Sequence, residues 1–97
     1  MYTEEEPGSG VAFEFDEAKS RANKLKHGID FVEAQKLWQD EDLVVVRSRD
    51  IDEPRFIVVA KTDDRYWAAV ITYRGAAVRI ISVRRARARE VRFYEGE

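Results

Sequence analysis

The sequence has no cysteine and only one histidine, and each shortage excludes a class of function. Without cysteine, the chain has no disulfide, no thiolate zinc site and no thiol nucleophile. His27 alone cannot form a multi-histidine metal site, so we expect no metal and no other cofactor. The sequence also has no phosphate-binding glycine loop and no Ser-His-Asp set. Stability therefore has to come from packing.

Long apolar runs are also missing. The longest span five residues, at Phe56–Ala60 and Trp67–Ile71, whereas a membrane-spanning helix needs about 20. Glu4, Glu5 and Glu6 stand where a secretory signal has basic and then apolar residues. We therefore expect a cytoplasmic protein that neither crosses a membrane nor is exported.

The 97 residues are enough for one hydrophobic core. Residues 1–10 are rich in Glu, Pro, Gly and Ser and have little to bury, which predicts a flexible tail. We expect a single domain over residues 11–97.

The net charge of -2 conceals a local asymmetry. Residues 1–42 carry five basic and eleven acidic side chains, a net of -6, whereas residues 79–92 carry six arginines and one glutamate, a net of +5. Such a basic block is typical of a surface that binds nucleic acid or an acidic partner. An ordinary solvated helix surface has the same composition, so that interpretation stays open.

Two helices are predicted near the N-terminus. The first is capped by Asp16 and ends at Gly28, and we expect its apolar stripe to face the core; the stripe comprises Ala18, Ala22 and Leu25. The second is capped by Asp30, with Glu33 at the capping-box spacing, and ends at Asp40–Asp42. Its expected buried residues are Phe31, Ala34, Leu37 and Trp38.

Four β-branched and aromatic runs follow and predict strands: Leu43–Val46, Arg55–Lys61, Tyr66–Arg74 and Ala77–Val83. The breaks at Asp63-Asp64 and Gly75 are short enough for hairpins, which favours an antiparallel meander. A closing helix is predicted over Arg84–Tyr94. The expected fold is therefore α+β, with two N-terminal helices, a four-stranded antiparallel sheet and a C-terminal helix.

The first helix places candidate functional residues along one flank. Lys19, Asn23 and Lys26 are separated by four and three residues, and His27 lies at the helix end. His27 is the only side chain with an ordinary pKa near neutrality, which suits proton transfer. Alternatively, these cations only complement the helix dipole.

The closing helix is expected to carry an arginine row, Arg85, Arg89 and Arg92, free to bind phosphates, while Ala86, Phe93 and part of Tyr94 pack inward. Glu90 has two interpretations: proton transfer, or an ion pair with a neighbouring arginine. Arg79 lies in an apolar strand, so we expect its head group to reach a cleft or rim. The tryptophans fit core packing.

Two separated motifs resemble the BrnT family of bacterial toxins. The string FEFDEAKSRANKLKHGIDFVEA (13–34) is similar to the opening of that family, with its aromatic start, D-x-x-K, asparagine and K-H-G. Glu53 and Arg55-Phe56 resemble its E-x-R-F segment. The string RGAAVRIISVRRARAREVRFYE (74–95) resembles its closing pattern.

The resemblance implies a RelE-like fold and a ribonuclease toxin of a type II toxin-antitoxin pair. Such a toxin cleaves RNA without metal and is silenced by a small ribbon-helix-helix antitoxin, here BrnA-like, encoded beside it; DNA is bound only through that antitoxin. We expect a 2:2 complex, because the partner is a twofold dimer. Cleavage through the 2'-hydroxyl needs proton transfer and cations around phosphorus. The candidate catalytic residues are His27, Glu90, Arg79 and Arg84, and the candidate RNA-binding residues are Lys19, Lys26, Arg85, Arg89 and Arg92.

The chain departs from the family pattern at two positions. Ala60 replaces a usual glycine, and Val91 follows Glu90 where the family has a basic residue. Loss of that cation opens an alternative function, an attenuated or inactive toxin homologue that acts as an antitoxin-binding co-repressor.

Overall fold

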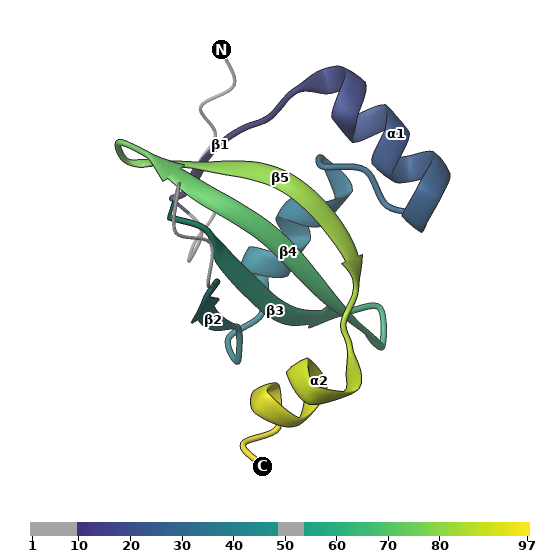
Figure 1. Cartoon of the computed structure of the whole chain (residues 1–97), viewed down its shortest axis with the longest axis vertical. Helices are drawn as coiled ribbons and strands as arrows, with labels where there is room; N and C mark the ends of the chain where they lie inside the picture. The colour runs from purple at the N-terminus through teal and green to yellow at the C-terminus, as the bar shows by residue number, and fades with distance from the viewer. Residues whose placement is uncertain (1–9, 49–53) are drawn as a thin grey trace.

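A computed structural model describes residues 10–48 and 54–97 (Figure 1). Its elements are β1 (Ala12–Glu14), α1 (Glu17–His27), the 3-10 helix η1 (Glu33–Gln39), β2 (Val44–Arg47), β3 (Phe56–Thr62), β4 (Arg65–Arg74), β5 (Ala77–Arg85) and α2 (Ala88–Tyr94). Apart from Gly10, the predicted tail lies outside the described residues, as does Glu53. Within the described ranges, no helix has the length and apolar character needed to cross a membrane.

The predicted fold class was wrong about the sheet. Across the described residues, five strands form one sheet in the order β1-β5-β4-β3-β2. β2 to β5 form the expected antiparallel meander, but β1 pairs in parallel with β5, from Ala12 beside Ala77 to Glu14 beside Arg79. The sheet is therefore mixed. β1 has three residues and its partner is 65 positions further along the chain, so neither alternation nor a turn marks it in the sequence.

The second predicted helix is present, but its geometry is 3-10 and not α. η1 is a 3-10 helix, and its buried residues together with the preceding Phe31 recur at every third position: Phe31, Ala34 and Leu37. Three residues per turn keep those side chains on one face. The capping box was correct, because the Glu33 N–H donates to Asp30 Oδ1 at 2.8 Å and the Asp30 N–H donates to Glu33 Oε1 at 2.9 Å.

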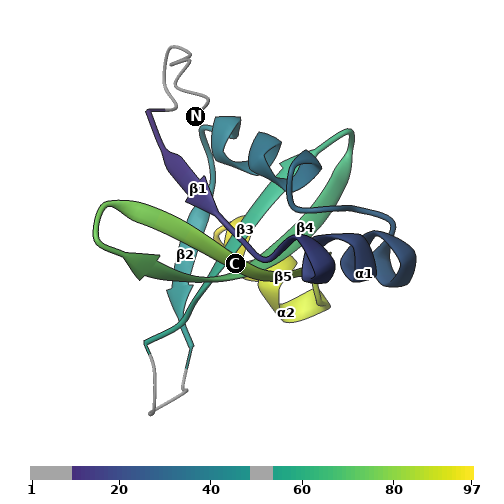
Figure 2. The same cartoon turned by 90° about the horizontal axis from the view of Figure 1, so that it is seen from above.

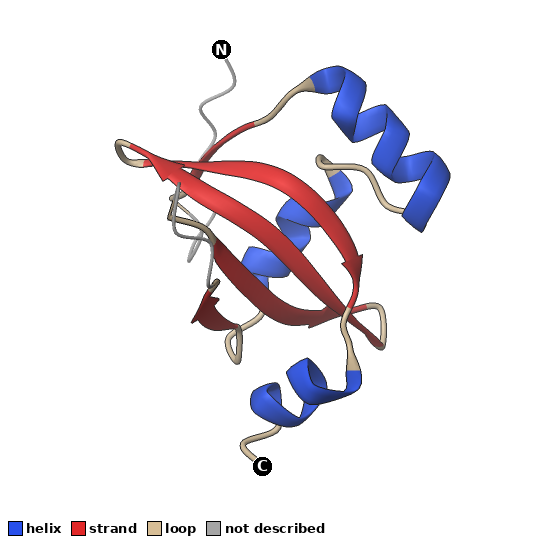
Figure 3. Cartoon of the chain, in the orientation of Figure 1, coloured by secondary structure: helices blue, strands red, loops and turns tan. Residues whose placement is uncertain are grey.

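The two faces of the sheet carry different helices, which Figures 2 and 3 show on opposite sides. η1 contacts β3 and contributes Ala34 and Leu37 to the main core, which the preceding Phe31 joins and whose sheet residues include Val58, Ile71 and Val83. On the other face, α2 contacts β3. Both faces are therefore partly covered, and functional side chains have to lie at the ends and edges of the sheet.

α1 packs against β5 through polar side chains, contrary to prediction. Ser20 and Asn23 are buried, whereas Leu25, Ala22 and Ala18 of the expected core stripe are exposed. The reason is that Asn23 acts as a strand partner: its Nδ2 donates to the Val83 carbonyl at 2.8 Å, and the Val83 N–H donates to its Oδ1 at 3.1 Å. β1 pairs only with residues 77–79 of β5, so Asn23 satisfies the next part of that edge.

Candidate functional site

The predicted arginine row does not form. α2 begins at Ala88, so Arg84 and Arg85 are the last residues of β5 and not part of a helix. Because side chains alternate along a strand, these two arginines lie on opposite faces of the sheet. Arg85 is on the core face, with its guanidinium 5.5 Å from the centre of the Trp67 ring. Only Arg89 and Arg92 remain together on α2, and both are exposed.

Arg84 and Glu90 form a fixed ion pair at the junction of β5 and α2. Arg84 donates from both terminal nitrogens to the two carboxylate oxygens of Glu90, at 2.8 and 2.9 Å, and the Arg87 N–H donates to Glu90 Oε1 at 2.8 Å. The two side chains are 20% and 13% exposed. Arg84 lowers the pKa of Glu90 despite its partial burial, with help from the Arg87 N–H. The ion pair that was one of the two interpretations of Glu90 is therefore present.

Arg79 lies on the same sheet face as Arg84. Their partners on β4 are Thr72 and Ala68, and Ser82 lies between them opposite Val70. Thr72, Val70 and Ala68 are each two positions apart on β4, so they and their partners share one face of the sheet. Arg79 and Arg84 are five positions apart on β5, because the register shift between Val70 and Ile71 leaves one extra residue in that strand. Arg79 donates to Glu14 Oε1 of β1 at 3.1 Å and is 30% exposed. Its head group therefore reaches the rim of the sheet, as expected.

His27 lies near the same end of β5 as Arg84. α1 runs alongside β5 in the same direction (Figure 1). The start of α1 lies near Arg79, because the pKa of Asp16 is lowered by the Lys19 N–H and, more weakly, by the Arg79 guanidinium. Further along α1, Asn23 forms a hydrogen bond with Val83 of β5. His27 is one turn beyond Asn23 and is half-buried.

No hydrogen bond or ion pair joins His27 to Arg84 or Glu90 in the described structure. Lys19 and Lys26 are exposed, whereas the Asn23 that separates them is buried. The predicted Lys19-Asn23-Lys26 row is thus not a continuous surface.

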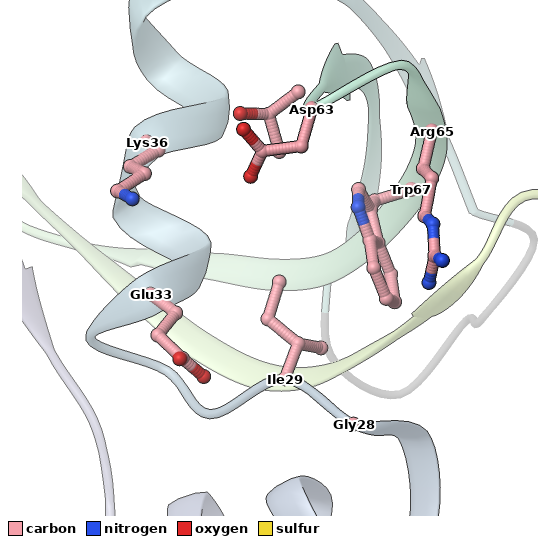
Figure 4. A pocket seen from close by; sticks show the side chains of 8 residues that line it. Gly28, Ile29, Glu33, Lys36, Asp63, Arg65 and Trp67 are labelled. Carbon is pink, nitrogen blue, oxygen red and sulfur yellow. The ribbon is translucent and has the colours of Figure 1, made fainter.

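A hollow of about 340 Å³ lies on the core side of the sheet, between η1 and the β3–β4 hairpin (Figure 4). Glu33 and Lys36 line it from η1, and Asp63, Arg65 and Trp67 line it from the hairpin region. Figure 4 shows the Asp63 carboxylate directed into this space and the Trp67 ring at its wall. Nothing in the sequence pattern marks Lys36 or Arg65, because isolated surface charges carry no signal without their neighbours in space.

A second group of side chains fixes α2 to the sheet. The Tyr94 hydroxyl donates to Asp40 Oδ2 at 2.8 Å, and the Lys61 N–H donates to the same oxygen at 2.8 Å. Burial disfavours ionisation of Asp40, but these hydrogen bonds and one from the Asp42 N–H outweigh it and lower the pKa of Asp40. Burial and the Asp40 carboxylate raise the pKa of Tyr94. The sequence indicated Asp40 only as a helix end.

The fold and site define a small mixed-sheet protein that presents arginines on a rigid strand end next to a short arginine-rich helix, an arrangement suited to phosphate groups. A family model described as the ribonuclease toxin BrnT of type II toxin-antitoxin systems matches residues 15–90. The chain belongs to this family, which confirms the resemblance and implies an RNA substrate and an antitoxin partner. Comparison with curated proteins gives no significant match.

Proposed function

We propose that this toxin is a metal-independent endoribonuclease in which Arg84 and Arg79 hold the scissile phosphate. The observation that carries the proposal is the Arg84–Glu90 pair, because it fixes a guanidinium at the end of β5 before any ligand arrives. A cation held in place needs no reorganisation when negative charge develops at phosphorus. Arg79, on the same face, supplies a second positive charge.

Arg84 keeps donors available for RNA although it is paired. Arginine has five N–H donors, and three of those of Arg84 are used, two by Glu90 and one by the Arg85 carbonyl at 3.4 Å. Two donors are left for phosphate oxygens. Glu90 is then a positioning residue, and its lowered pKa makes it a weak proton acceptor.

The reaction begins with attack of the RNA 2'-hydroxyl on phosphorus, which breaks the bond to the 5' oxygen and leaves a cyclic phosphate. A proton leaves the 2'-oxygen and another reaches the departing oxygen. His27 is our candidate for one of these transfers, because it lies toward the same end of β5 as Arg84 and an imidazole can both accept and donate a proton. Exposed cations on both helices, Lys19, Lys26, Arg89 and Arg92, with Arg85 on β5, would contact the flanking backbone.

The test is RNA cleavage by the purified chain in EDTA and in magnesium, with product ends identified by mass. We expect equal rates in both buffers and cyclic phosphate ends. Arg84→Ala should lower the rate about 10²–10³-fold, the usual effect of losing one preorganised donor, and His27→Ala should also lower it. Arg21→Ala is the matched control, since Arg21 is an exposed arginine on α1 whose carboxylate partner is 4.0 Å away. Activity that requires magnesium in contaminant-free protein would contradict the proposal.

Val91 favours a second candidate function. By the resemblance, it stands where the family usually has a basic residue, and it is half-buried on α2. An attenuated toxin would still bind the antitoxin and act as a co-repressor. Expression without the antitoxin separates the two functions: growth arrest supports the ribonuclease, whereas normal growth that Val91→Arg converts to arrest supports attenuation.

Neutralisation is expected from a BrnA-like ribbon-helix-helix antitoxin. Because that partner is an obligate twofold dimer, it offers two equivalent sites, and a 2:2 complex follows. Light scattering on the co-purified pair measures this directly, and a 1:1 mass would contradict it.

A further inference from the structure

α1 has its apolar side turned to solvent. At 100° per residue, Ser20 and Asn23 define the side that faces β5, and Leu25, Ala18 and Ala22 lie on the opposite side. All three are exposed, and Leu25 is 90% exposed. A helix that buries an asparagine and exposes a leucine reverses the usual arrangement, so the position of Leu25 is not explained by the core of this chain.

Cations flank this apolar side. Arg21, which is 72% exposed and only 4.0 Å from its carboxylate partner Glu17, lies on one flank, and the exposed Lys19 and Lys26 lie on the other. Lys24 is already neutralised by Glu33, with its Nζ 2.8 Å from Oε1. The outer face of α1, defined by Ala18, Ala22 and Leu25 with Arg21 and Lys26 at its margins, thus combines an apolar ridge with positive edges.

We propose that the outer face of α1 is the anchoring site of the antitoxin, through an amphipathic segment with an apolar ridge and carboxylates on both flanks. This inference rests on the proposed function for the identity of the partner. Charge complementarity selects the occupant: carboxylates pair with Arg21 and Lys26, and apolar side chains cover Leu25. RNA binding does not account for an exposed leucine at this position. A second copy of this chain is disfavoured, because a twofold contact would bring identical cations together.

The site is separate from the arginines that hold RNA. The outer face of α1 points away from β5, whereas Arg84 lies at the end of β5. Anchoring and inhibition are therefore different steps: one segment of the antitoxin binds α1, and another has to cover the strand end. Substitution of Leu25 or Arg21, which have no role in RNA binding, should weaken the complex without changing the catalytic rate.

The experiment measures binding of the purified antitoxin from the neighbouring gene to the full chain by calorimetry, in parallel with RNA cleavage. Leu25→Gln is the main variant, because Gln matches the helix propensity of Leu. Burial of one leucine corresponds to about 10- to 100-fold in affinity, so Leu25→Gln should weaken binding by that factor. Arg21→Glu should also weaken binding, and the loss of affinity should be larger at low salt than at high salt. Val45→Asp is the control, since Val45 is 45% exposed on β2, the edge strand farthest from β5.

Weaker binding for Leu25→Gln and Arg21→Glu, with normal cleavage and a normal Val45→Asp, supports the inference. If neither the parent nor any variant cleaves RNA but Leu25→Gln still weakens antitoxin binding, the proposed catalytic function fails and the inferred anchoring site stands. Unchanged affinity for Leu25→Gln overturns it, as does an equal loss for Val45→Asp. A change in the mass of the chain alone on Leu25→Gln, measured by light scattering, identifies a second copy as the occupant and also overturns it.

Discussion

α1 buries Asn23 and exposes Leu25, so we expect the polar residue, and not the apolar one, to contribute to the stability of the fold. Asn23 makes three hydrogen bonds from a site that is 7% exposed: two with Val83, and one from its Nδ2 to the Ile29 carbonyl at 2.8 Å. Asn23→Ala removes all three and leaves the Val83 and Ile29 backbone groups without these partners. At about 1 kcal/mol for each bond the loss is ~3 kcal/mol, and the better helix propensity of Ala returns roughly 0.6 kcal/mol.

The expected net effect is a loss of about 2–3 kcal/mol in the free energy of unfolding, or roughly 10–20 °C in Tm for a domain of this size. Leu25→Ala is the matched control on the same helix. Because Leu25 is 90% exposed, its truncation should change the free energy of unfolding by less than about 0.5 kcal/mol. Urea denaturation measures both variants.

Hydrogen exchange adds a local readout. The Val83 amide donates to Asn23, so its exchange should accelerate in Asn23→Ala beyond what the global loss explains. Two results would refute the reasoning. One is an Asn23→Ala variant as stable as the parent, and the other is a Leu25→Ala variant that is destabilised by a similar amount.

Three further predictions concern the sheet end and α2. Glu90 has a pKa lowered below its ordinary value of 4.5, so its ion pair stabilises the fold above that pH and loses this effect as the pH falls; Glu90→Gln should therefore be less stable than the parent at pH 7, with a difference that shrinks in urea titrations below pH 4.5. Tyr94→Phe removes one hydrogen bond to Asp40 and should cost about 1 kcal/mol, while an NMR titration should show the Asp40 pKa rising; an unchanged Asp40 titration would contradict the contact. Arg89→Ala should weaken binding to all single-stranded RNAs about equally and reduce the salt slope by roughly 0.7, and a sequence-selective loss would indicate base recognition.

The sequence was sufficient for features set by neighbouring residues. Asp16 caps α1 as expected, because its side chain can reach the Lys19 N–H only a few positions away. The turn at Asp63-Asp64 has positive φ at both residues, 52° and 63°, a conformation that aspartate tolerates. The meander of β2 to β5 follows from such short connections. The family resemblance rests on ordered motifs and is likewise a property of the sequence.

Tertiary structure decided what depends on distant partners. The rotation of α1 about its axis is set by the hydrogen bonds between Asn23 and Val83, 60 positions later. The apolar periodicity of the helix predicts the opposite rotation, with Leu25 facing the core. The closing helix was predicted to begin at Arg84, but pairing with β4 extends β5 to include Arg84 and Arg85. The fifth strand exists only through β5. Local chemistry therefore determined caps, turns and family, while long-range hydrogen bonds determined which side chains share the candidate site, because their free energy exceeds the small local preferences that a sequence displays.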